Sequence, residues 1–168
     1  MGIDSTVRAG HEDGGAPHQR RAESVHAKPS FKKSFVNRRC IIPADGFYEW
    51  ERLEAGGKLP HYLFSRDGSP LALAGLWGSW SDKDGQRITS CTVITTTPND
   101  LIAPIHNRMP VILTEDAWDR WLNPGFDDVE AFRSMLTSLD PGLMAEYSFS
   151  TLVNKVANNY PDCIAPLT

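Results

Sequence analysis

The sequence predicts an α+β domain built on a curved, barrel-like, mostly antiparallel sheet with two or three peripheral helices. Two observations support this fold class. Short runs rich in β-branched and aromatic residues are separated by turn sequences such as R-D-G-S at 66–69 and D-K-D-G at 82–85. Stretches with apolar residues at helical spacing are few. A chain of 168 residues is long enough for one domain with its own core.

The expected strands are connected mostly by short turns. They cover residues 40–43, 46–53, 60–65, 71–79, 87–97, 108–113 and 147–153. The turn sequence at 82–85 predicts a hairpin between two of these strands. Pro110 predicts an edge or a bulge in the strand that contains it.

Helices are expected at 29–39, from Thr114 to about residue 122 and at 127–138, with one helical turn at 99–102. Phe31 and Phe35 share a face of the first helix, and Thr114 is a good N-cap for the second. The side chains expected to face the core from the second and third helices are Trp118, Trp121, Leu122, Val129, Phe132, Met135 and Leu136.

Composition and cysteine usage are those of an intracellular globular protein. Hydrophobic residues make up 40% of the chain, and no apolar run approaches the roughly 20 residues that cross a bilayer. Residues 1–18 show no periodicity and no apolar core, so we expect them to be disordered and not a signal peptide. Three cysteines at unrelated spacings predict free thiols, and neither a metal nor a cofactor is expected. The expected location is cytoplasmic.

One segment is strongly basic although the net charge of the chain is −4. Between Gln19 and Arg39, seven basic residues stand against one acid, Glu23. Such a local basic face is typical of phosphate contacts. A solvated helix face beside a neutral core is an equally good interpretation of these charges alone.

Two short motifs contain a candidate acid and a candidate base. Glu49 lies between Tyr48 and Trp50 in G-F-Y-E-W at 46–50, so in a strand its side chain points away from both aromatic rings. His106 lies in I-H-N-R-M-P at 105–110. A glutamate and a histidine in such rigid surroundings are candidates for general acid–base catalysis. From the residues alone, an edge glutamate and a surface histidine are equally good interpretations.

Four segments together resemble the SOS-response-associated peptidase (SRAP) family, whose members process abasic sites in single-stranded DNA. They are R-R-C-I-I-P-A-D-G-F-Y-E-W at 38–50, A-G-L-W at 74–77, T-T-T-P-N at 95–99 and I-H-N-R-M-P-V-I-L at 105–113. The resemblance runs from about Gln19 to the C-terminus and implies the same curved-sheet fold. It implies a monomeric DNA-damage protein that is nucleoid-associated when bound to single-stranded DNA.

The resemblance also implies roles for individual residues. In the family, removal of the initiator Met exposes a cysteine whose thiol and α-amine capture the aldehyde of an abasic site as a thiazolidine, a covalent protein–DNA crosslink. Glu49 matches the glutamate that assists Met removal and proton transfers at the amine, and His106 matches a histidine that acts on the sugar and its phosphate leaving group. Trp50 matches a residue that stacks on bases, Arg21 a residue that contacts phosphate, and Thr95 lines the same pocket.

The sequence departs from the family pattern before residue 20. Residue 2 is Gly2, the first cysteine is Cys40 in a predicted strand, and Gln19 stands where the family has an active-site asparagine. The Gln19 side chain is longer than that of asparagine, so its amide group would be displaced. Such a displacement affects how the amide positions DNA. We therefore expect a partial SRAP domain at 19–168 that lacks its first strands and its nucleophile.

Three functions fit these observations, and the sequence leaves open whether the chain is an enzyme. The first is abasic site processing in the DNA damage response, and the second is non-catalytic binding of single-stranded DNA. The third is a decayed copy without function. A protease acting on other proteins is a weaker interpretation, because none of the cysteines lies in a cysteine-protease signature.

Overall fold

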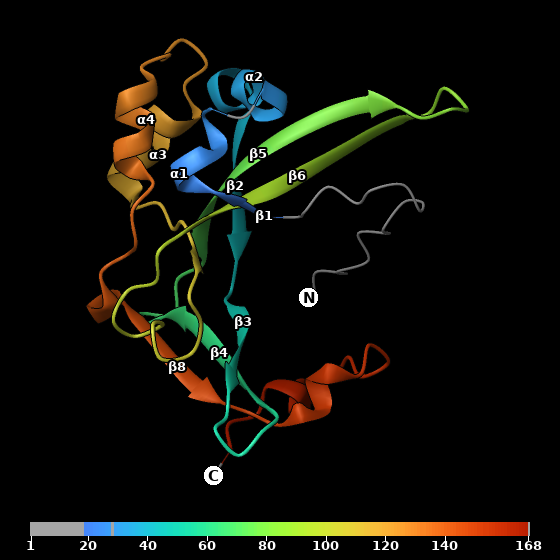
Figure 1. Cartoon of the computed structure of the whole chain (residues 1–168), viewed down its shortest axis with the longest axis vertical. Coiled ribbons are helices and arrows are strands. Elements are labelled where there is room, and N and C mark those ends of the chain that lie inside the picture. Colours follow the sequence, from blue (N-terminus) through green and yellow to red (C-terminus); the bar gives the residue numbers. More distant parts are fainter. Residues whose placement is uncertain (1–18, 28, 168) are drawn as a thin grey trace.

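The computed structural model describes residues 19–27 and 29–167, so the expectation for residues 1–18 lies outside the described part. The α+β class is confirmed, and the strands form two sheets that do not close into a barrel (Figure 1). Sheet A has the order β1-β6-β5-β2, with β7 also paired to β6, and sheet B has the order β3-β4-β8. Their bounds are β1 Gln19–Arg21, β2 Arg39–Ala44, β3 Phe47–Arg52, β4 Lys58–Ser65, β5 Leu71–Ser81, β6 Arg87–Thr96, β7 Met109–Pro110 and β8 Met144–Ser148.

The chain crosses from sheet A to sheet B between β2 and β3. These two strands follow each other in sequence, yet β2 pairs with β5 and β3 pairs with β4. Gly46 lies at the crossing, where a Cβ atom would come within 2.5 Å of the Leu63 carbonyl oxygen and of the Tyr62 ring. Any larger residue would collide with β4 of sheet B, so the start of β3 requires glycine.

Helices cover one face of sheet A (Figure 1). They are α1 Ala22–Val25, α2 Pro29–Asn37, α3 Glu115–Leu122 and α4 Val129–Met135, with 3-10 turns at Pro141–Leu143, Thr151–Asn154 and Pro161–Ile164. Ala74 and Leu76 of β5 pack in one core with Phe35 of α2, Trp121 of α3 and Phe132 of α4. None of the helices in the described residues is long and apolar enough to cross a membrane.

The opposite face of sheet A packs on sheet B along only part of its length. Leu71 and Leu73 of β5 join Leu63 of β4 and Met144 of β8 in a second core. Beyond this core, β5 and β6 continue as a long two-stranded arm that projects away from sheet B (Figure 1). The arm ends in the predicted hairpin at 82–85. Its outer part is therefore a sheet face without a second layer among the described residues.

Several expected elements have other bounds in the structure. The strand expected at 108–113 is reduced to β7 and one bridge between Leu73 and Ile112. The strand expected at 147–153 is β8, which begins three residues earlier and ends at Ser148. Leu122 was expected in the core but is 48% exposed, because α3 ends there and turns its last side chain to solvent. The predicted N-cap Thr114 makes no side-chain capping bond, whereas Asp128 caps α4.

Candidate active site

The structure brings Glu49 and His106 together from two parts of the chain. Glu49 lies on β3, and His106 lies in the loop that precedes β7. Glu49 Oε1 is 3.5 Å from His106 Nδ1, and the side chains are 17% and 40% exposed. The carboxylate is therefore mostly buried, while the imidazole reaches solvent.

Burial raises the pKa of the Glu49 carboxyl above its usual value. The nearby His106 and a hydrogen bond to the backbone of Trp50 lower this pKa in part, but burial is the larger effect. A carboxyl group whose pKa is raised holds its proton more tightly than a free glutamate does, which suits a group that takes up a proton and releases it again. Glu49 thus has the electrostatic setting of an acid–base residue.

The ring of His106 is oriented through one of its two nitrogen atoms. Nδ1 lies 3.0 Å from the carbonyl oxygen of Arg108 and 3.3 Å from its backbone nitrogen. A neutral ring can accept the Arg108 N–H, and a protonated ring can donate to the Arg108 carbonyl or to Glu49. No hydrogen bond within the described residues engages Nε2, so this nitrogen is left to meet a substrate.

The loop that carries His106 is held by the helical turn predicted at 99–102, which is confirmed. The His106 N–H bonds to the Ile102 carbonyl at 2.9 Å. The buried Asn99 side chain accepts the Ile102 N–H at 3.1 Å and donates to the Leu139 carbonyl at 2.8 Å. Asn99 therefore connects the start of the loop to the segment that follows α4.

Replacing Asn99 by alanine is expected to lower the free energy of unfolding by about 1–3 kcal/mol, because the Leu139 carbonyl loses its donor and the Ile102 N–H keeps only the backbone carbonyl of residue 99. Denaturant unfolding measures the change. Asn123→Ala is the control, since the Asn123 side chain accepts one backbone N–H in an exposed turn. Equal effects of the two substitutions would contradict this role of Asn99.

Arg108 joins the His106 loop to two other elements. Its guanidinium makes a bidentate contact with Glu23 of α1, at 2.6 and 3.1 Å. It also donates to the Thr95 carbonyl of β6 at 2.5 Å. The hydrogen bond from Arg108 lowers the pKa of Glu23, which keeps this carboxylate charged. Sequence reasoning did not single out Arg108 or Glu23, although both lie beside residues that it quoted.

The other predicted site residues of sheet A lie in one row. Arg21 is the in-register partner of Thr95, and Gln19 is the partner of Val93. Residues in register in a parallel pair share a face, so Gln19, Arg21 and Thr95 face the same side. Thr95 is buried and its hydroxyl lies 3.5 Å from the Arg108 guanidinium. This row therefore leads to the loop of His106.

Trp50 lies on the opposite face of β3 from Glu49, as strand alternation requires. Its ring centroid is 6.4 Å from that of Tyr48, and its indole N–H donates to the Asn154 side chain at 2.9 Å. The structure thus groups Trp50 with the aromatic face of sheet B. The predicted contact of Trp50 with bases stays a prediction.

A second ionisable cluster, which sequence reasoning missed, lies on the Glu49 face of sheet B. His61 is the cross-strand partner of Glu49. Its Nδ1 is 2.8 Å from Glu146 and its Nε2 is 3.1 Å from Glu51. Three strands are thereby joined next to Glu49, which stabilises the strand that presents the carboxylate. No group of residues in the described ranges has the arrangement of a metal site.

The burial of Glu49 predicts how stability depends on pH. Because the folded-state pKa lies above the unfolded-state value, ionisation of Glu49 opposes folding. The free-energy cost of ionising Glu49 in the folded protein is absent at pH values below the unfolded-state pKa. It grows as the pH rises from there through the folded-state pKa. Glu49→Gln is therefore expected to gain stability relative to the wild type over this rise, which denaturant unfolding across a pH series would measure. A parallel pH dependence of the two proteins would contradict the expectation.

Comparison with known proteins places these residues in a family. A family model described as SOS response associated peptidase (SRAP) matches residues 6–156. The chain is 45% identical over 144 residues to the abasic site processing protein YoqW of Bacillus subtilis, which covers 86% of this chain and 64% of that protein. It is 30% identical to the abasic site processing protein HMCES of Gallus gallus, covering 88% of this chain and 49% of that protein.

A solved structure supports the same fold. The crystal structure of a protein from Bacteroides thetaiotaomicron superposes with a TM-score of 0.81 at 32% identity, over 89% of this chain and 66% of that one. The chain thus spans between 49% and 66% of the length of these three proteins.

Proposed function

The chain belongs to the SOS response associated peptidase (SRAP) family, and from this membership we propose that it binds single-stranded DNA at an abasic site and transfers protons there. The observation that carries the proposal is the contact between Glu49 and His106. Relatives that share the family are named for abasic site processing. An abasic site presents an aldehyde that can be attacked and a phosphate that can leave. Both the attack and the departure need proton transfers.

The two residues divide this chemistry by their exposure. Glu49 is mostly buried and has a raised pKa, so it exchanges a proton with the group that attacks the aldehyde. His106 is more exposed and its Nε2 is the nitrogen that faces the sugar and the phosphate. Arg21 and Thr95 extend the surface along β1 and β6, and Arg21 supplies the phosphate contact.

A second candidate is non-covalent binding of single-stranded DNA, a function to which Cys40, Cys91 and Cys163 contribute no chemistry. Covalent capture as a thiazolidine needs a thiol next to a free α-amine. Cys40, Cys91 and Cys163 are all internal, so none of them carries an α-amine. Burial raises the pKa of the Cys40 thiol to about 11, so this thiol is protonated at neutral pH.

One experiment separates the two candidates. Purified protein is mixed with single-stranded DNA that contains one abasic site and run on a denaturing and a native gel, with intact DNA of the same sequence as the control. A band that survives denaturation, or cleaved DNA, supports processing. A shift on the native gel alone, weakened by salt, supports non-covalent binding. The absence of any shift or product would overturn both.

A further inference from the structure

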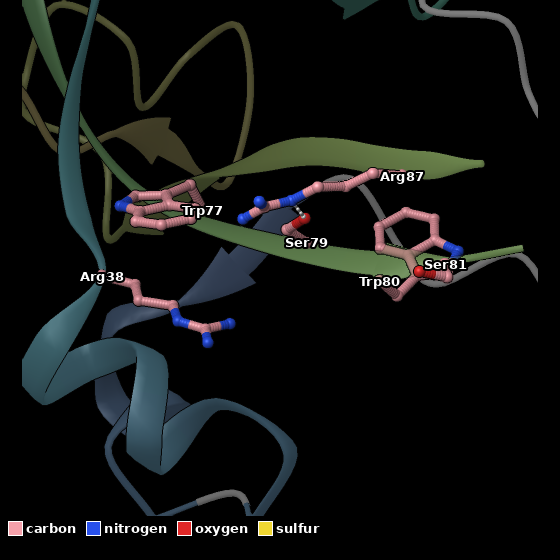
Figure 2. A pocket seen from close by; sticks show the side chains of 6 residues that line it. All are labelled: Arg38, Trp77, Ser79, Trp80, Ser81 and Arg87. Carbon is pink, nitrogen blue, oxygen red and sulfur yellow. Dashed lines mark hydrogen bonds between the residues drawn. The ribbon is translucent and has the colours of Figure 1, made fainter. Parts of the chain in front are cut away.

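A groove on the β5–β6 arm combines cations with exposed aromatic rings. It is about 360 Å³ in volume and is lined by Arg38, Trp77, Ser79, Trp80, Ser81 and Arg87 (Figure 2). Trp77 is 36% exposed and Trp80 is 51% exposed. Large indole rings at this exposure are unusual on a surface without a partner, and they indicate a binding face.

The two arginines are held in place without being neutralised. The Arg38 guanidinium lies 5.3 Å from the centroid of the Trp77 ring, and Arg87 Nε donates to the Ser79 hydroxyl at 2.8 Å. Neither arginine pairs with a carboxylate in the part of the chain that the structure describes. The nearby Asp82 uses its carboxylate to accept the backbone N–H groups of its own turn. The groove therefore presents positive charge to an anionic ligand.

Trp77, Ser79, Ser81 and Arg87 of the groove share one face of sheet A with the candidate active site, whereas Trp80, three residues after Trp77, alternates to the other face. Trp77 pairs with Cys91 on β6, and Gly75 pairs with Val93 two residues further along. Because side chains alternate, Cys91, Val93 and Thr95 face the same side as Trp77. Gln19 and Arg21 of β1 are the in-register neighbours of Val93 and Thr95. A strip thus runs from the groove past the exposed Gln19 and Arg21 to the His106 loop, with Val93 half-buried and Thr95 buried beneath it.

We propose that this groove is a second contact for single-stranded DNA, which holds the strand that leaves the abasic site along β6. The proposal rests on the proposed function and adds a subsite to it. Indole rings stack on bases without sequence preference, and arginine is suited to phosphate and to stacked bases. An acidic peptide would use the two cations but would leave the exposed indoles without stacking partners.

The dimensions fit a short length of DNA. Four residues of β6 separate Cys91 from Thr95, which corresponds to about 13 Å, and eight separate Arg87 from Thr95, about 26 Å. Phosphates along one strand are at least about 3.4 Å apart, so about eight nucleotides or fewer span the strip. An abasic oligonucleotide of about three nucleotides, with one on each side of the lesion, ends short of the groove, whereas one of about fifteen fills it.

The test measures the affinity of the full chain for these two abasic oligonucleotides, labelled with a fluorophore, over a series of salt concentrations. The variants are Trp77→Leu and the double substitution Arg38→Gln with Arg87→Gln. Either variant is expected to weaken binding of the long oligonucleotide at least about fivefold and to leave the short one unchanged. The double variant should also reduce the salt slope by about 1.4, the value for two single-strand phosphate contacts.

A matched control removes two arginines from the other side of sheet A. Arg120→Gln with Arg133→Gln takes the same charge from α3 and α4, and circular dichroism checks that every variant is folded. Equal affinity of wild type and groove variants for the long oligonucleotide would overturn the groove and leave the proposed function standing. An equal loss of affinity for the long oligonucleotide in the control variant would also overturn the groove. Failure of the wild type to bind either oligonucleotide would overturn both proposals.

Discussion

Replacing Arg39 by methionine is expected to lower the free energy of unfolding by about 3–5 kcal/mol, the largest effect on stability that we expect from one substitution. The Arg39 guanidinium is buried and donates only to backbone carbonyl groups. They belong to Phe35, Val36, Trp121, Asn123 and Phe126. Methionine would fill part of the volume but would take the arginine donor from all five carbonyl groups, of which that of Asn123 also accepts the Phe126 N–H.

The reason for the size of this effect is where the carbonyl groups lie. Those of Phe35 and Val36 are in the last turn of α2, and that of Trp121 is in the last turn of α3. The last carbonyl groups of a helix have no partner within the helix and carry its negative dipole end. One cation therefore caps two helices at once, and it also lies 3.7 Å from the Phe132 ring centroid.

Denaturant unfolding of Arg39→Met and Arg39→Lys tests this account. Lysine keeps the charge but reaches fewer carbonyl groups, so it should lose less stability than methionine while remaining below the wild type. Arg120→Gln is the control, because Arg120 is exposed on α3. If Arg39→Met unfolds at the same denaturant concentration as the wild type, the carbonyl groups must find other donors.

Arg39 also shows why the basic segment could not be interpreted from the sequence alone. The charges between Gln19 and Arg39 suggested a face for phosphate. In the structure, Arg20 and Arg39 are each 8% exposed, and Arg20 lies over the Phe31 ring. Charge counting treats all arginines alike, whereas the direction of each side chain follows from tertiary packing. Of the segment, Arg21 and Arg38 point to the face that leads to the candidate site.

The strands were predictable from local pattern, but their partners were not. Runs rich in β-branched, aromatic and other apolar residues located β5 and β6, and the turn sequence located their hairpin. β2 and β3 are consecutive yet lie in different sheets, and the pairing of β3 with β4 needs the close approach of Gly46 to Tyr62 and Leu63. β1 was missed because its three residues pair with β6 from a distant part of the sequence. Such pairings depend on the whole fold.

Two motifs far apart in sequence predicted the candidate site, and their contact is what the structure adds. Glu49 and His106 were each conspicuous within a short motif. Their distance of 3.5 Å could not be predicted, because it depends on the turn at Asn99 and on Arg108, which fix the loop. The burial of Glu49, and with it the direction of its pKa, is likewise a property of the packed sheets.

Glu49→Gln is expected to slow the conversion of abasic single-stranded DNA to product, crosslinked or cleaved, by about 10²–10⁴-fold, the usual contribution of general acid–base catalysis. Glutamine keeps the size and a hydrogen bond but cannot exchange a proton. Affinity for the same DNA should change less than about twofold, since the substitution leaves the phosphate contacts in place. In the wild type, the rate should rise with pH through the raised pKa of Glu49, and this rise should be absent in the variant.

Two further variants make this prediction specific to the pair. Glu51→Gln removes a carboxylate two residues away on the same face of β3, where Glu51 contacts His61 and not His106, so the rate should be nearly unchanged. Glu49→Gln combined with His106→Gln should be no slower than the more damaging single variant, because residues that act as a unit are not additive. Additive losses would mean that the two side chains contribute independently to one rate-limiting transition state, and an unchanged rate in Glu49→Gln would remove Glu49 from the chemistry. A Glu51→Gln rate as low as that of Glu49→Gln would assign the effect to the His61 cluster, which positions β3.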